Sequence, residues 1–434
     1  MSALHIVGSN SVEIAEQFVA AIRSGAMVAG EALPTVRQLA QQLGVNPNTV
    51  ASAYARLRDA GLVISDGRRG TRVAEPPSRI ETGAQVPDGL IDLAQGNVDA
   101  ALLPCPQSDW LSTHTRPMTG YDADSDEPEL LQMGRQWMDS QGVLSPCLGV
   151  FSGALDAIER ALRVHVSPGS RAWVEDPCWP PMLALLAHLR LKAMPLLVDS
   201  QGCVLPPEED KASAVILTPR AHNPTGVSMS PQRAAAWSAF LAGRPDCMLV
   251  LDDHWGPMAR PDGGASLPHA ALQVYVLSLS KFLGPDLRIA LAAGGPQPLK
   301  GMQEQQTLGP RWVSLLLQRL AVSLWRQAQA GGLIERAGRD YAHRRDELAM
   351  ALKARGLSGL PAHDGLHLWI PVADEAAVVQ GLAAKGWAVQ PGRAFRLRSA
   401  PAIRISVGNL RRGQAEALAD DLVMSMRGIG RISV

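Results

Sequence analysis

The sequence is poor in cysteine and has no run of residues that would carry it into a membrane. Its five cysteines stand singly at positions 105, 147, 178, 203 and 247, and none forms a CxxC pair. An odd number without that spacing argues against a structural zinc or a disulfide framework, so we expect reduced thiols in a cytoplasmic protein. No apolar run reaches the roughly 18 residues of a membrane span. The N-terminus also lacks the basic-then-apolar pattern of a signal peptide.

Charge and length narrow the class of protein only a little. The 41 basic and 41 acidic residues cancel, so net charge indicates no particular partner. The 434 residues exceed what one ordinary core needs and predict at least two domains. Residues 74–90 are rich in Pro and Gly and have no periodic apolar residues, which is typical of a linker. We therefore expect domains over residues 1–74 and 91–434, joined by a linker over 75–90.

The first 74 residues show the pattern helix, helix, helix, hairpin. Ser11, Thr35 and Asn46 are expected to cap the three helices, and Gly44 to end the second. Apolar residues recur at helical spacing on the second and third helices, and short strands are predicted near 62–65 and 71–74. The predicted core residues are Val36, Leu39, Ala40, Leu43, Val50, Ala53, Tyr54 and Leu57. These elements together predict a winged helix-turn-helix.

The outward face of this unit suits DNA. Short polar side chains near the start of the third helix can approach base edges, and arginines on the hairpin can reach the phosphate backbone. A small helical domain with solvated arginines would show the same pattern. The first 80 residues hold eight Arg and six acids, a net of 8 − 6 = +2, which does not decide between them. The candidate DNA contacts are Arg37, Asn48, Thr49, Ser52, Arg56, Arg68, Arg69 and Arg72.

A resemblance favours DNA binding. Over residues 10–74, the string LPTVRQLA…LGV…TV..AY..L...GLV resembles the DNA-binding domain of GntR-type regulators. The resemblance implies that the partner is a double-stranded operator. Arg is common in that family where Pro47 or Asn48 stands here, so we expect a different base preference.

Residues 91–434 alternate short apolar strands with helices. Strands are predicted at 172–175, 214–218, 248–252, 275–278 and 289–293. Such alternation predicts a mostly parallel α/β sheet. Beyond Pro310, long helices and two strands near 366–370 and 402–407 predict a smaller α+β lobe over about residues 310–434.

The segment SLSKFLGPDLR, residues 278–288, points to a cofactor. Lys281 follows a buried strand, hydroxyl residues flank it, and an arginine stands seven positions later. This arrangement suits pyridoxal 5′-phosphate (PLP), because the lysine can form a Schiff base while Ser278, Ser280 and Arg288 hold the phosphate. Taken alone, the same string is explained as well by a solvated loop lysine.

Other short motifs follow in an order that supports PLP. Gly153 and Ala154 begin a helix whose N–H groups can approach a phosphate. Trp179 can stack on a pyridine ring, Asn223 can bond its hydroxyl, and Asp252 can hold the pyridinium N–H. Each has a plain structural explanation by itself: helix packing, a core tryptophan, a turn or a helix cap. Their combination favours the cofactor.

The set resembles fold-type I aminotransferases over roughly residues 90–430. The resemblance implies that Lys281 is the Schiff-base lysine, that Tyr121 reaches the phosphate of a neighbouring subunit in a homodimer, and that Arg404 binds the carboxylate of a small amino compound. Two departures stand out. His254 replaces the usual tyrosine that touches the ring hydroxyl, and the acidic residues 124–127 replace a Gly-rich start after Tyr121.

A winged helix followed by an aminotransferase-like domain is the architecture of the MocR subfamily of GntR regulators, and the chain is identified as a member. Within it, the chain looks most like the branch linked to vitamin B6 salvage. The resemblance implies a sensor, in which PLP or an amino compound shifts DNA binding. An active aminotransferase with an accessory DNA-binding domain remains the alternative, although His254 and the acidic segment argue against efficient turnover. A PLP-independent protein with a fossil domain would be expected to have lost Lys281.

Overall fold

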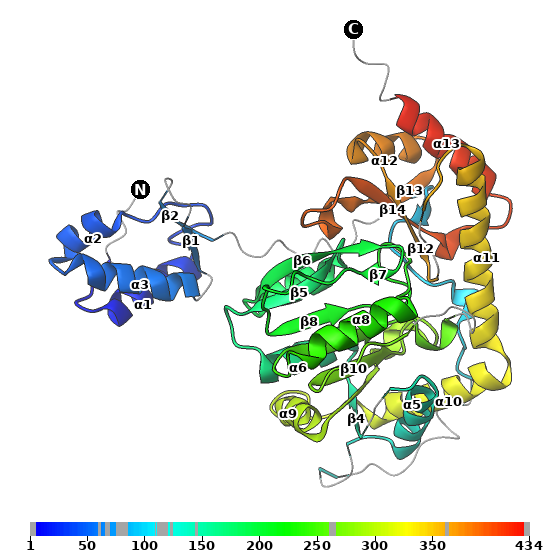
Figure 1. The fold of residues 1–434 in the computed structure, drawn as a ribbon, viewed down its shortest axis with the longest axis horizontal. Helices are drawn as coiled ribbons and strands as arrows, with labels where there is room; N and C mark the ends of the chain where they lie inside the picture. Colours follow the sequence, from blue (N-terminus) through cyan, green and yellow to red (C-terminus); the bar gives the residue numbers. More distant parts are fainter. Residues whose placement is uncertain are drawn as a thin grey trace. The chain divides into compact units, whose positions relative to one another are not determined.

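The computed structural model describes residues 6–59, 62–65, 70–74, 86–108, 110, 120–121, 125–143, 146–259, 266–360 and 364–428. The chain divides into two compact units, an N-terminal unit within Met1–Thr82 and a larger one that begins at Gly83. Figure 1 shows the elements of both.

The N-terminal unit has the predicted order of three helices and a hairpin. Its elements are α1 (Ser11–Arg23), α2 (Val36–Leu43), α3 (Pro47–Asp59), β1 (Val63–Ser65) and β2 (Thr71–Val73). The two strands pair antiparallel, with Val63 opposite Val73. The winged helix-turn-helix predicted from the sequence is therefore confirmed.

Helix caps explain where these helices begin, and one differs from expectation. The cap of α1 is Asn10, whose side chain accepts from the Val12 and Glu13 amides, so Ser11 is the first helical residue and the prediction was wrong by one position. Thr35 caps α2 as predicted: its hydroxyl oxygen accepts from the Gln38 amide, and the Gln38 side-chain oxygen accepts from the Thr35 amide.

The connection between α2 and α3 is also as predicted. Gly44 ends α2 at φ 67°, a left-handed conformation that suits glycine. The side chain of Asn46 accepts from the Asn48 amide, 2.8 Å away, at the start of α3. The stripe Val50, Ala53, Tyr54 and Leu57 is buried. The Tyr54 hydroxyl also donates to the Pro34 carbonyl at 2.7 Å, which ties α3 to the chain before α2.

The large unit is built on an eight-stranded sheet in the order β4-β11-β10-β9-β8-β5-β6-β7. Strands β5, β8, β9 and β10 run parallel, and β11 lies antiparallel between β10 and β4. The mostly parallel sheet predicted from the sequence is confirmed. The strands are β4 (Cys147–Phe151), β5 (Arg171–Asp176), β6 (Lys192–Asp199), β7 (Gly202–Cys203), β8 (Ala214–Leu217), β9 (Met248–Asp253), β10 (Gln273–Ser278) and β11 (Ala290–Gly294).

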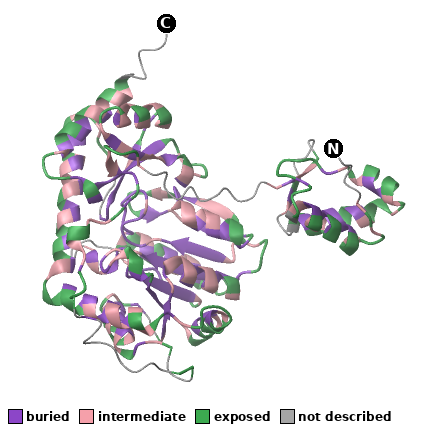
Figure 2. Ribbon diagram, turned by 180° about the vertical axis from the view of Figure 1, so that it is seen from behind, coloured by how far each residue is buried: buried purple, intermediate pink, exposed green. Residues whose placement is uncertain are grey.

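Helices cover both faces of this sheet, which explains why its central strands are continuous apolar runs. In Figure 1, α8 lies in front of the sheet and α6 behind it. Every residue of β9 and β10 is buried, and Figure 2 shows the buried strands between half-exposed helices. The helices are α5 (Pro128–Ser140), α6 (Ala154–His165), α7 (Pro180–His188), α8 (Pro231–Ala242), α9 (Pro296–Thr307), α10 (Leu315–Ala330) and α11 (Leu333–Ala354).

A smaller lobe carries a four-stranded sheet in the order β12-β14-β13-β3. Its elements are β12 (His367–Pro371), α12 (Glu375–Ala383), β13 (Trp387–Pro391), β14 (Ala402–Ser406), α13 (Ala415–Gly428) and, from the start of the unit, β3 (Ile91–Leu93). The expected α+β lobe is present, but its edge strand β3 comes from just after the linker.

The division between the lobes also falls later than residue 310. Side chains of α10 such as Trp325 belong to the core of the large sheet. The long helix α11, at the right of Figure 1, contributes Tyr341 to that core and Leu348 and Leu352 to the core of the small lobe. Helix α11 therefore connects the two cores, because a hydrophobic stripe continues along its whole length.

Two kinds of feature are absent from the described residues. No described helix is long and apolar enough to cross a membrane. No group of three or more His, Cys, Asp or Glu side chains in the described ranges is placed to hold a metal ion.

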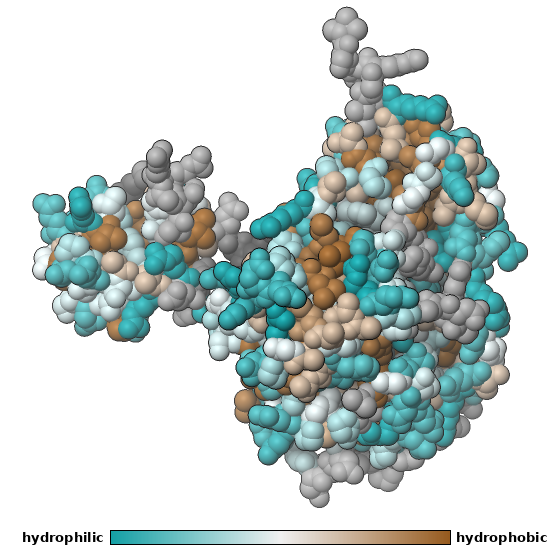
Figure 3. All heavy atoms as spheres, in the orientation of Figure 1, coloured by the Kyte–Doolittle hydropathy of each residue, from teal (hydrophilic) through white to brown (hydrophobic). Residues whose placement is uncertain are grey.

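On the face seen in Figure 3, hydrophilic residues predominate and hydrophobic ones gather in small groups.

Candidate cofactor site and DNA-binding face

The sheet topology brings the scattered motifs to one edge. Strands β5, β8, β9 and β10 end there because they are parallel, and β4 ends there because it lies two antiparallel steps from β10. Strand β11 runs the other way and begins there. The carboxyl edge of parallel strands is where α/β sheets bind ligands. Residues at this edge are Gly153, Ala154, Trp179, Asn223, Asp252, His254, Ser278, Ser280, Lys281 and Arg288.

Lys281 follows β10 and turns its amine toward the start of the unit. Nζ donates to the Gly96 carbonyl oxygen at 2.9 Å. Desolvation, and then the charge of Arg404, lower the pKa of Lys281 to about 8. A sizeable fraction of the amine is therefore neutral near physiological pH, and the neutral amine is the nucleophilic form.

Asp252 lies at the end of β9 with a buried oxygen that has no partner. Within the described part of the chain, its Oδ1 makes no hydrogen bond. Burial, reinforced by the charge of Asp253, raises the pKa of Asp252 to about 7. An unpaired buried carboxylate oxygen is costly. It is the acceptor that a pyridinium N–H requires, and such a cation would stabilise the ionised carboxylate.

A second buried acid, Glu175, stands on β5, two strands from β9 in the same sheet. Glu175 on β5 accepts from the Thr218 amide with both oxygens, at 3.1 Å each, and its Oε2 lies 3.4 Å from Nε2 of His222. Burial raises the pKa of Glu175 to about 8 and lowers that of His222 to about 3. Glu175 is mostly protonated and His222 neutral at pH 7, so this contact is not an ion pair.

Residues predicted to hold the cofactor phosphate also lie close to one another. A Cβ on Gly153 would lie 2.8 Å from Nη2 of Arg288, so the guanidinium packs directly on the backbone where α6 begins. Gly153 has φ +95°, which also favours glycine. Ser278 is buried, and its Oγ accepts from the Ser280 amide at 3.4 Å. A helix start, a guanidinium and small side chains together form a fitting cradle for a phosphate.

Arg404, on β14 of the small lobe, reaches into the same site. Nη1 donates to Oδ1 of Asn223 at 3.0 Å, and Nη2 donates to the Ala94 carbonyl. Its guanidinium carbon lies 4.9 Å from the centre of the Phe395 ring. Burial lowers the pKa of Arg404 to about 10, which still leaves it charged at neutral pH.

Two histidines complete the surroundings of Lys281. Burial, and then the nearby Lys281 charge, lower the pKa of His254 to about 4, so its ring is neutral and offers one N–H donor. His367 on β12 is buried with Nδ1 3.0 Å from the Ser406 hydroxyl. Burial, then the charges of Arg404 and Lys281, hold the pKa of His367 well below its usual value.

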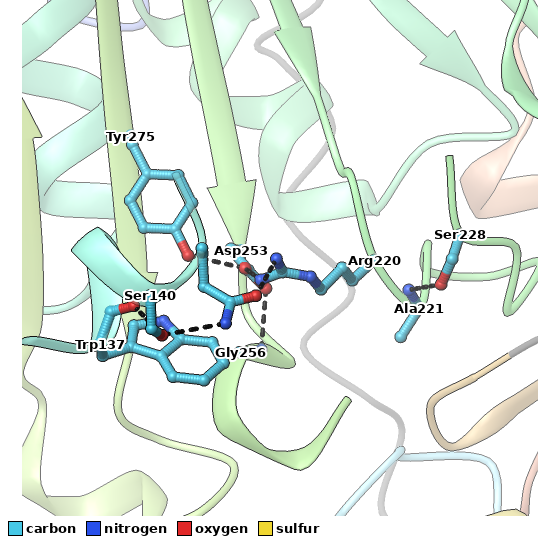
Figure 4. A network of polar contacts seen from close by, with 9 residues as sticks. Trp137, Ser140, Arg220, Ala221, Ser228, Asp253, Gly256 and Tyr275 are labelled. Carbon is cyan, nitrogen blue, oxygen red and sulfur yellow. Dashed lines mark hydrogen bonds and ion pairs between the residues drawn. The ribbon is translucent and has the colours of Figure 1, made fainter. Parts of the chain in front are cut away.

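Next to Asp252, Asp253 belongs to a buried network that supports the site (Figure 4). Its Oδ2 accepts from the Arg220 guanidinium and, at 2.7 Å, from the Tyr275 hydroxyl, while Oδ1 accepts from the Gly256 amide at 2.8 Å. Arg220 also donates to Gln141 at 2.7 Å. The adjacent carboxylates thus differ: Asp253 is fully engaged in holding the turn after β9, whereas Asp252 has an oxygen free for a ligand.

Two expected residues have less defined surroundings. Trp179 is half-buried between β5 and α7, and its ring stacking on a cofactor stays a prediction. Tyr121 is 80% exposed, with its ring against Trp312 at 6.0 Å and Arg311 at 4.9 Å. Its role in a neighbouring subunit also stays a prediction.

The DNA candidates lie mostly on the outside of the N-terminal unit. Arg37, Asn48, Ser52 and Arg56 are at least partly exposed, as is Thr49. Arg72 is partly buried, and its Nη1 donates to the Gly30 carbonyl at 3.1 Å, so part of its guanidinium is already engaged. Arg68 and Arg69 lie outside the described residues.

Comparison with known proteins matches both units. Residues 10–73 match the gntR family of bacterial regulatory proteins, and residues 142–422 match aminotransferase class I and II. The chain is 36% identical over 431 residues to the vitamin B6 salvage pathway transcriptional repressor PtsJ of Salmonella typhimurium, covering 96% of this chain and 98% of that protein. This chain belongs to the MocR subfamily of GntR-type transcriptional regulators.

More distant relatives agree with this assignment. This MocR-type regulator is 26% identical to the probable rhizopine catabolism regulatory protein MocR of Rhizobium meliloti, over 80% of this chain and 77% of that one. Its large unit has the fold of Pyrococcus horikoshii kynurenine aminotransferase, with a TM-score of 0.70, 19% identity and coverage of 82% and 93% of the two chains. The regulator thus combines a DNA-binding unit with a domain of the PLP-dependent aminotransferase family.

Several residues of the site were not foreseen from the sequence. Gly96, Ala94 and His367 reach the site only because β3 and β12 belong to one small-lobe sheet, which no local pattern reveals. Glu175, near the end of β5, and His222, in the turn after β8, lie beside or within the predicted motifs, and that position was the available signal.

Proposed function

We propose that this chain is a PLP-responsive transcriptional regulator in which Lys281 holds the cofactor covalently. The observation that carries the proposal is the pairing, in one site, of a partly neutral lysine amine with the unpartnered buried Oδ1 of Asp252. When bound, PLP supplies an aldehyde that condenses with an amine and a ring nitrogen that withdraws electrons when protonated. The residues proposed to hold it are Lys281, Asp252, Asn223, His254, Trp179, Gly153, Ala154, Ser278, Ser280 and Arg288.

The chain's own groups divide the work of binding. Arg288, Ser278 and the amides at the start of α6 orient the phosphate, while Asp252 fixes the ring nitrogen and Asn223 with His254 bond the ring hydroxyl. We further propose a homodimer in which Tyr121 of a second copy completes the phosphate site. Its high exposure and its contact with Arg311 support a surface role. Sedimentation at micromolar concentration tests this, because a strict monomer fully loaded with PLP would contradict it.

The DNA-binding part follows from the exposed face of α3. We propose that Asn48, Thr49 and Ser52 read base edges of a double-stranded operator, while Arg37, Arg56, Arg68, Arg69 and Arg72 position the unit on the phosphates. A dimer would present two such faces to two half-sites. Location in the cytoplasm, where DNA and reduced thiols are found, belongs to the same proposal.

The effector is proposed to be PLP itself or a small amino compound whose carboxylate pairs with Arg404. The Salmonella relative is named for repression of vitamin B6 salvage. That name supports the proposal that this chain controls the supply of vitamin B6. Footprinting on genomic DNA with and without PLP tests it: protected sites near B6-salvage genes that change with PLP are expected, and protection unaffected by PLP would contradict it.

An active aminotransferase is the second candidate. Its support is that Lys281 and Arg404, which transamination would use, both bond to backbone carbonyls of residues 94–96, and that Asp252 lies near the end of β9, the strand next to β10. Incubation of the PLP-loaded protein with a panel of amino and keto acids separates the two, since turnover of about 1–10³ per second would mark an ordinary enzyme. We expect turnover far below that range.

A further inference from the structure

One short segment of the chain is hydrogen-bonded to two of the cationic side chains of the cofactor site, Lys281 and Arg404. The Gly96 segment, residues 92–97, leaves β3 and presents two carbonyl oxygens to the site. The Gly96 oxygen accepts from Nζ of Lys281 at 2.9 Å, and the Ala94 oxygen accepts from Nη2 of Arg404. The amine proposed to take the cofactor and the guanidinium proposed to take an effector carboxylate are thus both bonded to the same stretch of backbone.

The geometry at Gly96 requires a residue without a side chain. Gly96 has φ +72°, and a Cβ there would lie 2.9 Å from Cε1 of His367 and 3.5 Å from Nη2 of Arg404. Farther along, a Cβ on Gly408 would lie 2.1 Å from the Asn97 carbonyl oxygen, so the segment passes directly over the small lobe there. Because Gly96 has no side chain, its backbone can pack closely against His367 and Arg404, and its carbonyl oxygen can accept from Lys281.

Hydrogen bonds of Asp92 fix the backbone conformation of this segment. Oδ1 of Asp92 accepts from the Ala94 amide at 2.9 Å and the Gln95 amide at 3.0 Å. The Asp92 carbonyl accepts from Nδ2 of Asn409 at 3.0 Å. These bonds turn the chain sharply after β3, and the turn points the carbonyls of residues 94 and 96 at the two cations.

This segment stands directly between the site and the linker in the sequence. It continues β3 (Ile91–Leu93), which pairs in parallel with β13 at the edge of the small-lobe sheet. Residues 75–90, which precede β3, join it to the DNA-binding unit. Residues 94–97 are therefore joined, through the three residues of β3, to the stretch of chain that connects the two units.

The bond from Nζ to Gly96 depends on the chemical state of Lys281. The free amine or ammonium group has two or three N–H donors. When the amine nitrogen condenses with an aldehyde, a C=N bond forms, one water molecule leaves, and at most one proton stays on nitrogen. With at most one N–H left, for which the ring hydroxyl of a bound cofactor would compete, Nζ would lose or weaken its bond to the Gly96 oxygen.

We propose that the Gly96 segment is a latch that reports the state of Lys281, and of Arg404, to the linker and so to the DNA-binding unit. The latch is closed while its carbonyls hold the free amine and guanidinium, and it opens when an aldehyde takes Nζ or a carboxylate takes Arg404. This inference rests on the proposed function and specifies how the cofactor site regulates DNA binding.

The first test compares PLP with pyridoxine 5′-phosphate on the full-length protein. The second compound carries an alcohol in place of the aldehyde, so it offers the same phosphate and ring nitrogen but cannot condense with Lys281. We expect PLP to change operator affinity by about 5–150-fold. We also expect PLP to speed hydrogen exchange at the Ala94 and Gln95 amides, and the alcohol to do neither at saturation.

The outcomes separate the latch from the proposed function. If PLP leaves operator affinity unchanged, the proposed function fails. If PLP and the alcohol change the affinity equally, the regulator is PLP-responsive but the latch is wrong. Unchanged exchange at residues 94–97 on loading with PLP would also contradict the latch.

A matched pair of variants provides an independent test. Gly96→Ala places a methyl group against His367 and should open the latch without any cofactor. Gly89→Ala has a similar backbone requirement, φ +89°, but a Cβ there meets nothing within 4 Å. We expect the PLP-free operator affinity of Gly96→Ala to approach that of the loaded wild type, and Gly89→Ala to behave as unloaded wild type. Equal shifts in both variants would show that linker strain, not the latch, sets the affinity.

Discussion

In the N-terminal unit the candidate recognition residues lie outside, on one face of a 13-residue helix, whereas in the large unit the candidate ligand residues lie near the ends of strands far apart in the sequence, and some of them, such as Asp252 and Arg404, are buried. Asn48 and Ser52 are exposed and accessible to a partner. Asp252, Lys281 and Arg404 have shifted pKa values because the fold has removed them from water. A substitution on the exposed face of α3 is therefore expected to change one contact with DNA, whereas a substitution in the buried site is expected to change several linked interactions.

The largest effect is expected from Lys281→Ala, because it removes the only atom proposed to bond covalently to the cofactor. Borohydride reduction of the PLP-loaded wild type should leave one cofactor mass per chain, and the variant should retain none. Lys300→Ala is the control, since that lysine is largely exposed on α9. A trapped adduct that persists in Lys281→Ala but disappears in the control would place the reactive lysine elsewhere.

Asp253→Asn should destabilise the large unit by about 3–5 kcal/mol, because it leaves the buried Arg220 guanidinium without its anion. Asp199→Asn is the matched control: Asp199 pairs with Arg233 at 2.7 Å but is 46% exposed, and such pairs contribute about 0–1 kcal/mol. Denaturant unfolding followed by tryptophan fluorescence measures both. Equal destabilisation would show that the Asp253 network has no special structural role.

The rate of covalent loading should depend on pH through Lys281. The amine is protonated and unreactive below its pKa of about 8, so the rate should fall roughly tenfold per pH unit below that value and level off above it. Arg404→Gln removes a positive neighbour and should move the midpoint to higher pH, whereas Arg404→Lys should keep it nearly in place. Stopped-flow absorbance checks this, and a midpoint near 10.5 in the wild type would contradict the described surroundings.

On the DNA-binding face, substitutions of the wing arginines and substitutions on α3 should have different effects on DNA binding. Arg68→Ala or Arg69→Ala should weaken binding to all sequences and reduce the slope of the salt dependence by about one unit for each phosphate interaction that is removed. Thr49→Ala or Ser52→Ala should change base preference instead. Binding to randomised operators at several salt concentrations distinguishes them. Unchanged binding in all four variants would refute this docking of α3 and the wing.

The smallest effect concerns the start of α1. Asn10→Ala should cost the N-terminal unit about 1 kcal/mol, because it removes the acceptor for two helix amides. Ser11→Ala should change stability by less than about 0.5 kcal/mol. Thermal unfolding of the full chain, followed through the transition of this unit, compares them. A larger destabilisation in Ser11→Ala would restore Ser11 as the cap.

The two units also differ in how far the sequence predicts them. Caps such as Thr35 and Gly44 act over three or four residues, so local patterns located α2 and α3 correctly. The parallel strands were recognisable because burial on both faces makes them uniformly apolar. Lys281, Asp252 and Arg288 were singled out by motifs near strand ends, and their roles toward a cofactor stay predictions.

What the sequence could not predict depends on contacts between distant segments. Strand β3 has three residues and no periodicity, and only its pairing with β13 makes it a strand. The contact of Gly96 with Lys281 joins residues 185 positions apart. Asp252 and Asp253 form a doublet in the sequence, and only the Arg220 and Tyr275 side chains show which of the two is engaged within the protein.

Coupling between the cofactor site and the DNA-binding unit is tested most directly by operator affinity. The dissociation constant for a footprinted operator would be measured for PLP-free and PLP-loaded protein, and for the loaded protein with candidate amino compounds. We expect values that differ by about 5–150-fold between at least two of these states. Agreement of all of them within about twofold, together with transaminase turnover at ordinary enzyme rates of about 1–10³ per second, would contradict the coupling.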